Sequence, residues 1–115
     1  MTVHWYSASL FYCGKREGGD HQSALWEERI IVLRAPGQVE AEKAAIAIGR
    51  EKPLHYHAMD GTHITWEFRQ VERCYEIESE TLEHGTEVLS RFLRASEAES
   101  LLRPFDDESK APPKP

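Results

Sequence analysis

Apolar and polar residues follow regular spacings along most of the chain. Alternation with a period of two predicts a β-strand, whereas apolar residues at i, i+3, i+4 and i+7 predict a helix. Alternation rich in aromatic and β-branched residues predicts five strands. They span residues 3–13, 25–35, 54–59, 62–78 and 86–95. One side of the first strand is more apolar than the other, and we expect the more apolar side to face the core. That side consists of Tyr6, Ala8, Leu10 and Tyr12.

Two segments have helical spacing. Residues 38–50 place four small or apolar side chains on one face. These are Ala41, Ala44, Ala45 and Ile48. Gly49 is typical of a residue that closes the C-terminal end of such a helix. A second, shorter helix begins at Ser96, because Ser96 and Glu99 match a capping box.

The predicted order of elements is therefore β-β-α-β-β-β-α. This order favours an α+β fold, in which a mostly antiparallel sheet of about five strands carries one main helix on one face. The 115 residues include 40% hydrophobic and 30% charged ones, which is typical of one globular domain. We place the domain at residues 1–103 and a polar, proline-rich tail at 104–115.

Charge and composition exclude several classes of protein. The net charge of −6 argues against a nucleic-acid-binding protein, because such proteins neutralise phosphates with basic residues. No apolar run approaches the ~20 residues that a membrane span needs. Residues 1–5 lack the layout of a signal peptide, so we expect a cytoplasmic protein. Cys13 and Cys74 lie far apart and form no redox or zinc motif.

Several short motifs occur in a characteristic order. They are Trp5-Tyr6-Ser7-Ala8, Glu27 to Ala35, Lys43-Ala44, Asp60-Gly61, Trp66-x-Phe68 and Gly85-Thr86-Glu87-Val88. In combination they resemble a small bacterial family, the domain of unknown function 4288, over about residues 4–95. The resemblance implies a compact bacterial α+β domain. No catalytic or binding residue is carried over from it.

Six histidines raise the question of a metal site. His55 and His57 lie two residues apart on one predicted strand and so share a face. A two-residue hairpin turn at Asp60-Gly61 would place His63 on the opposite face, whereas a three-residue turn would bring it to the same face. Closed zinc sites need three or four ligands. We therefore predict no metal and no cofactor.

Motifs of nucleophilic catalysis and of phosphate binding do not occur in the sequence. We therefore predict no catalytic residue. The alternative to a protein without catalytic residues is a small-molecule-binding or enzymatic domain with a pocket between sheet and helix. Its polar residues would be His55, His57, Glu67 and Arg69.

Negative charge is concentrated in residues 67–87, which hold seven glutamates against two arginines. The apolar phase changes near Arg69-Gln70, which predicts a β-bulge. Beyond it, Glu72, Glu76 and Glu78 share a predicted face with Cys74, opposite Val71, Tyr75 and Ile77. This face is either the solvated side of a half-buried strand or a binding surface for a basic protein partner.

A single substantial helix can cover only one face of the sheet. Trp5 and Trp66 are the residues we expect at a subunit interface if the second face is uncovered. The sequence therefore favours a non-enzymatic bacterial protein-interaction module that forms a homodimer. A regulatory or immunity-type partner of a basic protein is one version of that hypothesis.

Overall fold

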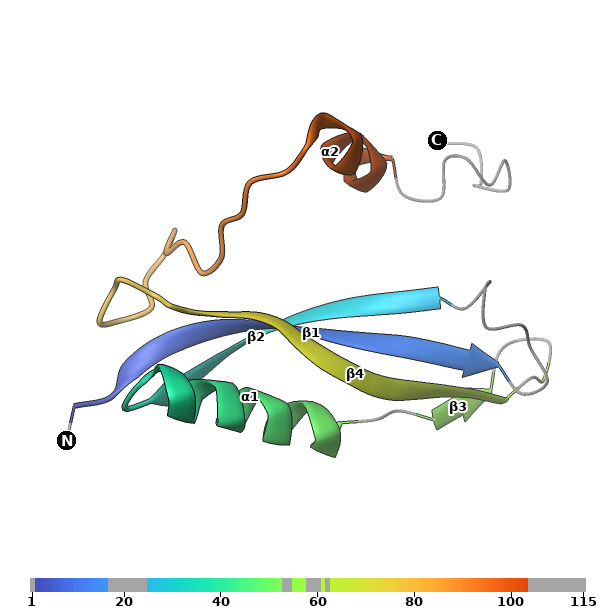
Figure 1. Cartoon of the computed structure of the whole chain (residues 1–115), viewed down its shortest axis with the longest axis horizontal. Helices are drawn as coiled ribbons and strands as arrows, with labels where there is room; N and C mark the ends of the chain where they lie inside the picture. Colours follow the sequence, from blue (N-terminus) through green and yellow to red (C-terminus); the bar gives the residue numbers. More distant parts are fainter. Residues whose placement is uncertain (1, 17–24, 53–54, 58–60, 62, 104–115) are drawn as a thin grey trace.

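The centre of the molecule is a four-stranded antiparallel sheet with strand order β2-β1-β4-β3 (Figure 1). The computed structural model describes residues 2–16, 25–52, 55–57, 61 and 63–103. The strands are β1 (His4–Arg16), β2 (Leu25–Ala35), β3 (His55–His57) and β4 (His63–Glu76). Three of them are long, and β1 is central because it pairs with both β2 and β4.

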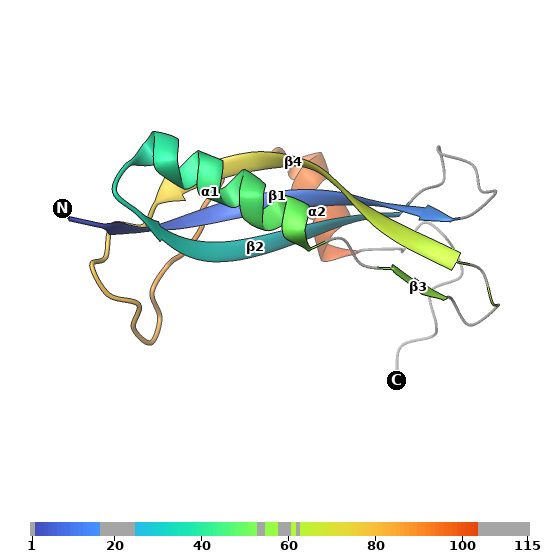
Figure 2. The same cartoon turned by 90° about the horizontal axis from the view of Figure 1, so that it is seen from below.

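One face of the sheet is covered by α1 (Gln38–Glu51), as Figures 1 and 2 show. The residues of α1 buried against the sheet are small, which lets the helix approach closely: Ala41, Ala45 and Gly49. The side of β1 beneath them is the one that the sequence predicted. Tyr6, Ala8, Leu10 and Tyr12 are all buried there.

Strand β4 contains two bulges where the sequence predicted one. The pairing with β1 skips Arg69, between Phe68 and Gln70, and skips Glu72, between Val71 and Arg73. Each extra residue reverses the faces of the residues that follow it. As a result Phe68, Val71 and Cys74, which are three residues apart, all contact the core on the side of α1.

The predicted five-strand sheet with order β-β-α-β-β-β-α is wrong. The observed order is β1-β2-α1-β3-β4-α2, and residues 86–95 form no strand. These residues do alternate, but alternation only sorts side chains onto two faces. A strand also needs a neighbouring edge with which to exchange hydrogen bonds.

The last helix, α2 (Ala95–Leu102), begins one residue earlier than predicted. Its capping box uses Arg94 and Glu97 in place of Ser96 and Glu99. The Arg94 amide donates to Glu97 Oε1 at 2.8 Å. The Arg94 side chain also lowers the pKa of the Glu97 carboxyl, by hydrogen bonding to it.

The hairpin between β3 and β4 has a different register from the one that a two-residue turn would give. His57 pairs with His63 and His55 pairs with Thr65. By this register His63 belongs to the same face as His55 and His57. The side chains of His55 and His57 lie outside the described part of the structure, as do residues 58–60 and the tail 104–115.

Both cysteines are free thiols buried in the sheet, on opposite faces. Cys74 lies in the core beneath α1, and its carbonyl accepts a hydrogen bond of 2.8 Å from the Gln38 side chain. Burial raises the pKa of the Cys74 thiol. Cys13 lies on the other face, opposite Trp26 of β2 and Glu67 of β4. Neither helix in the described residues is long and apolar enough to cross a membrane.

Candidate functional site

The face of the sheet opposite α1, which we call the open face, is the main candidate site. Alternation along the paired strands assigns its side chains. They are Trp5, Ser7, Ser9, Phe11 and Cys13 of β1, Trp26, Glu28, Ile30, Val32 and Arg34 of β2, and Glu67, Gln70, Arg73 and Tyr75 of β4. Lys15, Arg69 and Glu72 contact this set.

Large apolar side chains on the open face remain about half exposed. The exposed fractions are 52% for Trp26, 47% for Ile30 and 42% for Val32, all on β2, and 47% for Tyr75 on β4. Ile30 and Val32 are neighbours on this face, and exposed apolar patches on soluble proteins mark interaction surfaces.

Arginines lie over three aromatic rings of this face. The Arg34 guanidinium carbon is 5.3 Å from the Trp5 ring centroid, and that of Arg69 is 5.6 Å from the Trp26 centroid. Arg73 lies 5.9 Å from the Tyr75 ring. Tryptophan, tyrosine and arginine are the residue types enriched at protein interfaces.

Two buried serines lie in the middle of the open face and differ in their partners. The Ser9 hydroxyl donates to Glu28 Oε2, and Arg91 Nη1 lies 3.5 Å from the same oxygen. The Ser7 hydroxyl is fully buried and has no hydrogen-bond partner among the described residues. A buried hydroxyl without a partner is destabilising.

We therefore expect Ser7→Ala and Ser9→Ala to change stability in opposite directions. Ser7→Ala should raise the free energy of unfolding by about 1 kcal/mol, because it removes an unsatisfied group. Ser9→Ala should lower it by about 2 kcal/mol, because a hydrogen bond to a charged carboxylate is lost. Urea unfolding followed by tryptophan fluorescence measures both. Equal losses in the two variants would contradict this account of the open face.

The segment from residue 78 to 103, which we call the C-terminal arm, leaves the end of β4 on the side of the open face (Figure 1). Arg73 and Tyr75 of β4 line a hollow of about 1170 Å³ together with the arm up to Phe92. Phe92 itself is fully exposed, and α2 buries none of its residues. The arm therefore presents apolar side chains that the other described residues do not cover.

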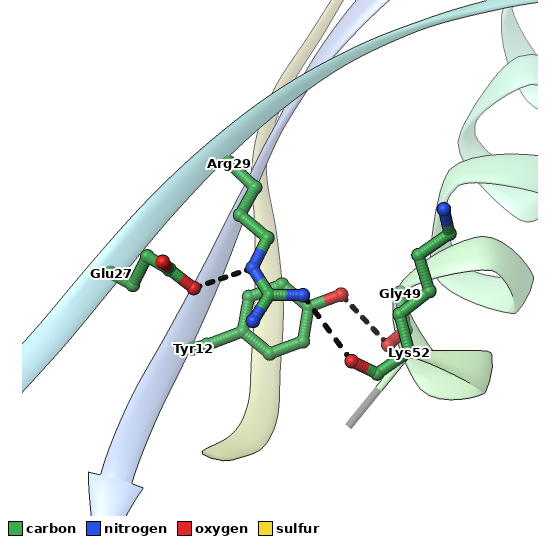
Figure 3. Close-up of polar contacts among 5 residues, drawn as sticks. All are labelled: Tyr12, Glu27, Arg29, Gly49 and Lys52. Atoms are coloured by element: carbon green, nitrogen blue, oxygen red, sulfur yellow. Dashed lines mark hydrogen bonds and ion pairs between the residues drawn. The ribbon is translucent and has the colours of Figure 1, made fainter. Parts of the chain in front are cut away.

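A cluster on the opposite side of the sheet anchors the end of α1 (Figure 3). The Tyr12 hydroxyl donates to the Gly49 carbonyl at 2.9 Å, and burial raises the pKa of Tyr12. The Arg29 guanidinium carbon lies 4.1 Å from the Tyr12 ring centroid. Arg29 also donates to the Lys52 carbonyl at 3.3 Å and pairs with Glu27. These contacts tie α1 to β1 and β2, and we assign the cluster a structural role.

Glu67 and Arg69, which were predicted for a pocket between sheet and helix, lie on the side away from the helix. Glu67 pairs with Lys15 at 3.2 Å and with Arg69 at 3.6 Å. His55 and His57, the other two residues of that hypothesis, have side chains outside the described residues. Within the described parts of the chain, no three histidine, cysteine or acidic side chains are grouped to hold a metal ion.

The two tryptophans predicted for an interface lie on different faces. Trp5 belongs to the open face and is partly exposed. Trp66 is only 6% exposed and belongs to the core cluster on the side of α1. Trp26, which the sequence did not single out, is instead the most exposed aromatic side chain of the open face.

The three predicted acidic binding residues do not form one row along a strand. Glu72 lies in the second bulge and pairs with Arg73, whereas Glu76 lies 3.6 Å from His4 Nδ1. Glu78 is exposed at the base of the arm. The second bulge separates Glu72 from the others, and it also turns Cys74 into the core.

Comparison with known proteins identifies a family for most of this structure. The model of the domain of unknown function DUF4288 matches residues 5–90, which run from β1 into the arm. No curated protein and no solved structure matches the chain. The match covers well over half of the chain, and it agrees with the order of motifs in the sequence. The chain belongs to the DUF4288 family.

Proposed function

We propose that this protein is an interaction module that forms a homodimer through its open face. The observation that carries the proposal is the uncovered apolar side of the sheet. Ile30 and Val32 are neighbours on this face of β2, Trp26 lies beyond Glu28, and all three leave about half of their surface exposed. Burial of apolar area is the main driving force of association, at roughly 25 cal/mol per Å².

The polar groups of the open face support an interface more than a reaction site. Most of its charged side chains are paired, as Lys15 is with Glu67 and Arg73 with Glu72. Arginines over aromatic rings and an apolar centre are the usual composition of a protein interface. A module of this kind acts by presenting a surface, and its activity is binding.

Sedimentation equilibrium across micromolar concentrations tests the proposal. We expect the full chain to form a dimer, and we expect Ile30→Asp to weaken association by at least about tenfold, as at an interface hot spot. Val39→Asp is the matched control, because Val39 is equally apolar and is 58% exposed, but lies on α1.

Circular dichroism checks that both variants remain folded. A full chain that stays monomeric at high micromolar concentration would overturn the proposal. So would an equal effect of Ile30→Asp and Val39→Asp, because the interface would then not lie on the open face.

A further inference from the structure

We propose that the C-terminal arm of one copy lies on the open face of a second copy, and that the arm of the second copy lies on the open face of the first. This inference rests on the proposed homodimer and names the segment that covers the interface. The occupant of the open face is thus a second copy of this chain.

The arm needs a surface that the described part of its own chain does not provide. Helix α2 has eight residues and none is buried. Isolated helices shorter than ~12–15 residues are marginal in water, so α2 requires tertiary contacts. Its Leu101 and Leu102 are 53% and 79% exposed, and Phe92 just before it is fully exposed.

Contact between the arm and its own sheet is sparse at the point where the two approach. Arg91 Nη1 lies 3.5 Å from Glu28 Oε2. The arm then continues to α2, which stands off from the sheet (Figure 1). Each chain therefore carries an uncovered apolar segment above an uncovered apolar face.

The two surfaces have net charges of opposite sign. The open face and the residues that contact it carry four cations against three carboxylates: Lys15, Arg34, Arg69 and Arg73 against Glu28, Glu67 and Glu72. The arm carries six glutamates against three arginines. Four glutamates of the acidic stretch, Glu78, Glu80, Glu83 and Glu87, lie in the arm, and opposite net charges favour its association with the open face of a second copy.

Symmetry makes the exchange self-limiting. Because every copy has both an arm and an open face, one two-fold axis pairs each arm with a face. No arm and no open face then stays unpaired in the dimer. Standard interfaces involve roughly 20–30 residues on each side. The arm, residues 78–103, together with the open face provides a surface of that extent.

Cross-linking between singly substituted chains tests the exchange. One chain carries Phe92→Cys and the other carries Ile30→Cys, and a short bis-maleimide is added to their mixture. The native thiols, Cys13 and Cys74, are both buried. We expect a covalent heterodimer, because neither singly substituted chain can join its own arm to its own face. Val39→Cys replaces Ile30→Cys in the control mixture and should give no heterodimer.

A chain with both Phe92→Cys and Ile30→Cys distinguishes the alternative in which the arm folds onto its own sheet. Cross-links found only within that chain, and none between chains, would overturn the exchange. Removal of residues 88–115 separates the two proposals. We expect the shortened chain to lose at least about tenfold in dimer affinity, as expected when hot-spot residues are removed. Unchanged dimerisation of the shortened chain would overturn the exchange alone, whereas a monomeric full chain would overturn both.

Discussion

Tyr12→Ala should lower the free energy of unfolding by about 3–5 kcal/mol, the usual cost of removing a buried aromatic side chain. Tyr12 is fully buried and contacts three elements. Its ring meets Phe68 of β4 edge-on, with centroids 5.6 Å apart, and lies beneath Arg29 of β2. Its hydroxyl holds the carbonyl of Gly49 on α1. A domain of this size is stable by about 5–15 kcal/mol, so the loss is a large part of the total.

Urea denaturation measures this loss, and Tyr12→Phe serves as its control. The phenylalanine variant keeps the ring and loses only the hydrogen bond to the Gly49 carbonyl. We expect it to cost about 1 kcal/mol, the typical net contribution of one hydrogen bond. The Gly49 carbonyl also accepts a hydrogen bond of 3.4 Å from the Lys52 amide. If Tyr12→Phe were as destabilising as Tyr12→Ala, the hydroxyl and not the packed ring would be what fixes α1.

Gly49→Val should destabilise the protein by about 3 kcal/mol, the upper part of the range for overpacking a core. A Cβ atom at Gly49 would overlap the Phe68 ring, which lies directly beneath the helix. The ring cannot swing aside freely, because it packs edge-on against the buried Tyr12 ring. The helix would have to lift from the sheet, and thermal unfolding would show the change as a lower Tm.

Gly37→Val is the matched control for this prediction. Gly37 precedes α1 and has φ of −164°, an extended conformation that valine adopts readily. A Cβ there would meet only the carboxylate end of Glu40, which can move. We expect a loss below about 1 kcal/mol, as for an altered N-cap. In addition, Phe68→Ala should be less damaging in the Gly49→Val background than alone, because contacting residues couple.

The position of Gly49 shows why a helix boundary is harder to predict than a helix. The apolar spacing of residues 38–50 correctly predicted α1 and the face that it buries. Gly49 was interpreted as a terminal cap, because glycine often ends helices. In the structure α1 continues to Glu51, and Gly49 is required by the close Phe68 ring. A neighbour from a distant strand leaves no local signal in the sequence.

The two bulges of β4 show the same limit within a strand. One change of phase near Arg69 was visible, since the apolar residues moved from even to odd positions. The second change of phase is visible only if Cys74 is interpreted as a core residue, and free cysteine is among the residue types most often buried. Grouping Cys74 with the neighbouring glutamates concealed the second change. The predicted acidic face followed from that grouping.

The open face was predictable in outline but not in its members. A single main helix left one face of the sheet uncovered, and Trp5 on that face was identified. The exposed apolar residues of β2 were not identified. The alternation of β2 places Ile31 and Leu33 in the core, but it does not tell whether Ile30 and Val32 are covered. The arm could not be anticipated, since residues 86–95 alternate like a strand.

Cys13 and Cys74 lie on opposite sides of one sheet, so labelling of these two native thiols can report local opening at each side. A thiol reagent reaches Cys74 only when α1 separates from the sheet. It reaches Cys13, which is 3% exposed on the open face beside Trp26 and Glu67, only when the sheet opens locally at that face. Local opening has a free energy between zero and that of global unfolding. The two labelling rates, followed by mass spectrometry of each peptide, therefore measure separately how readily the protein opens at the α1 side and at the open face, in one unmodified chain.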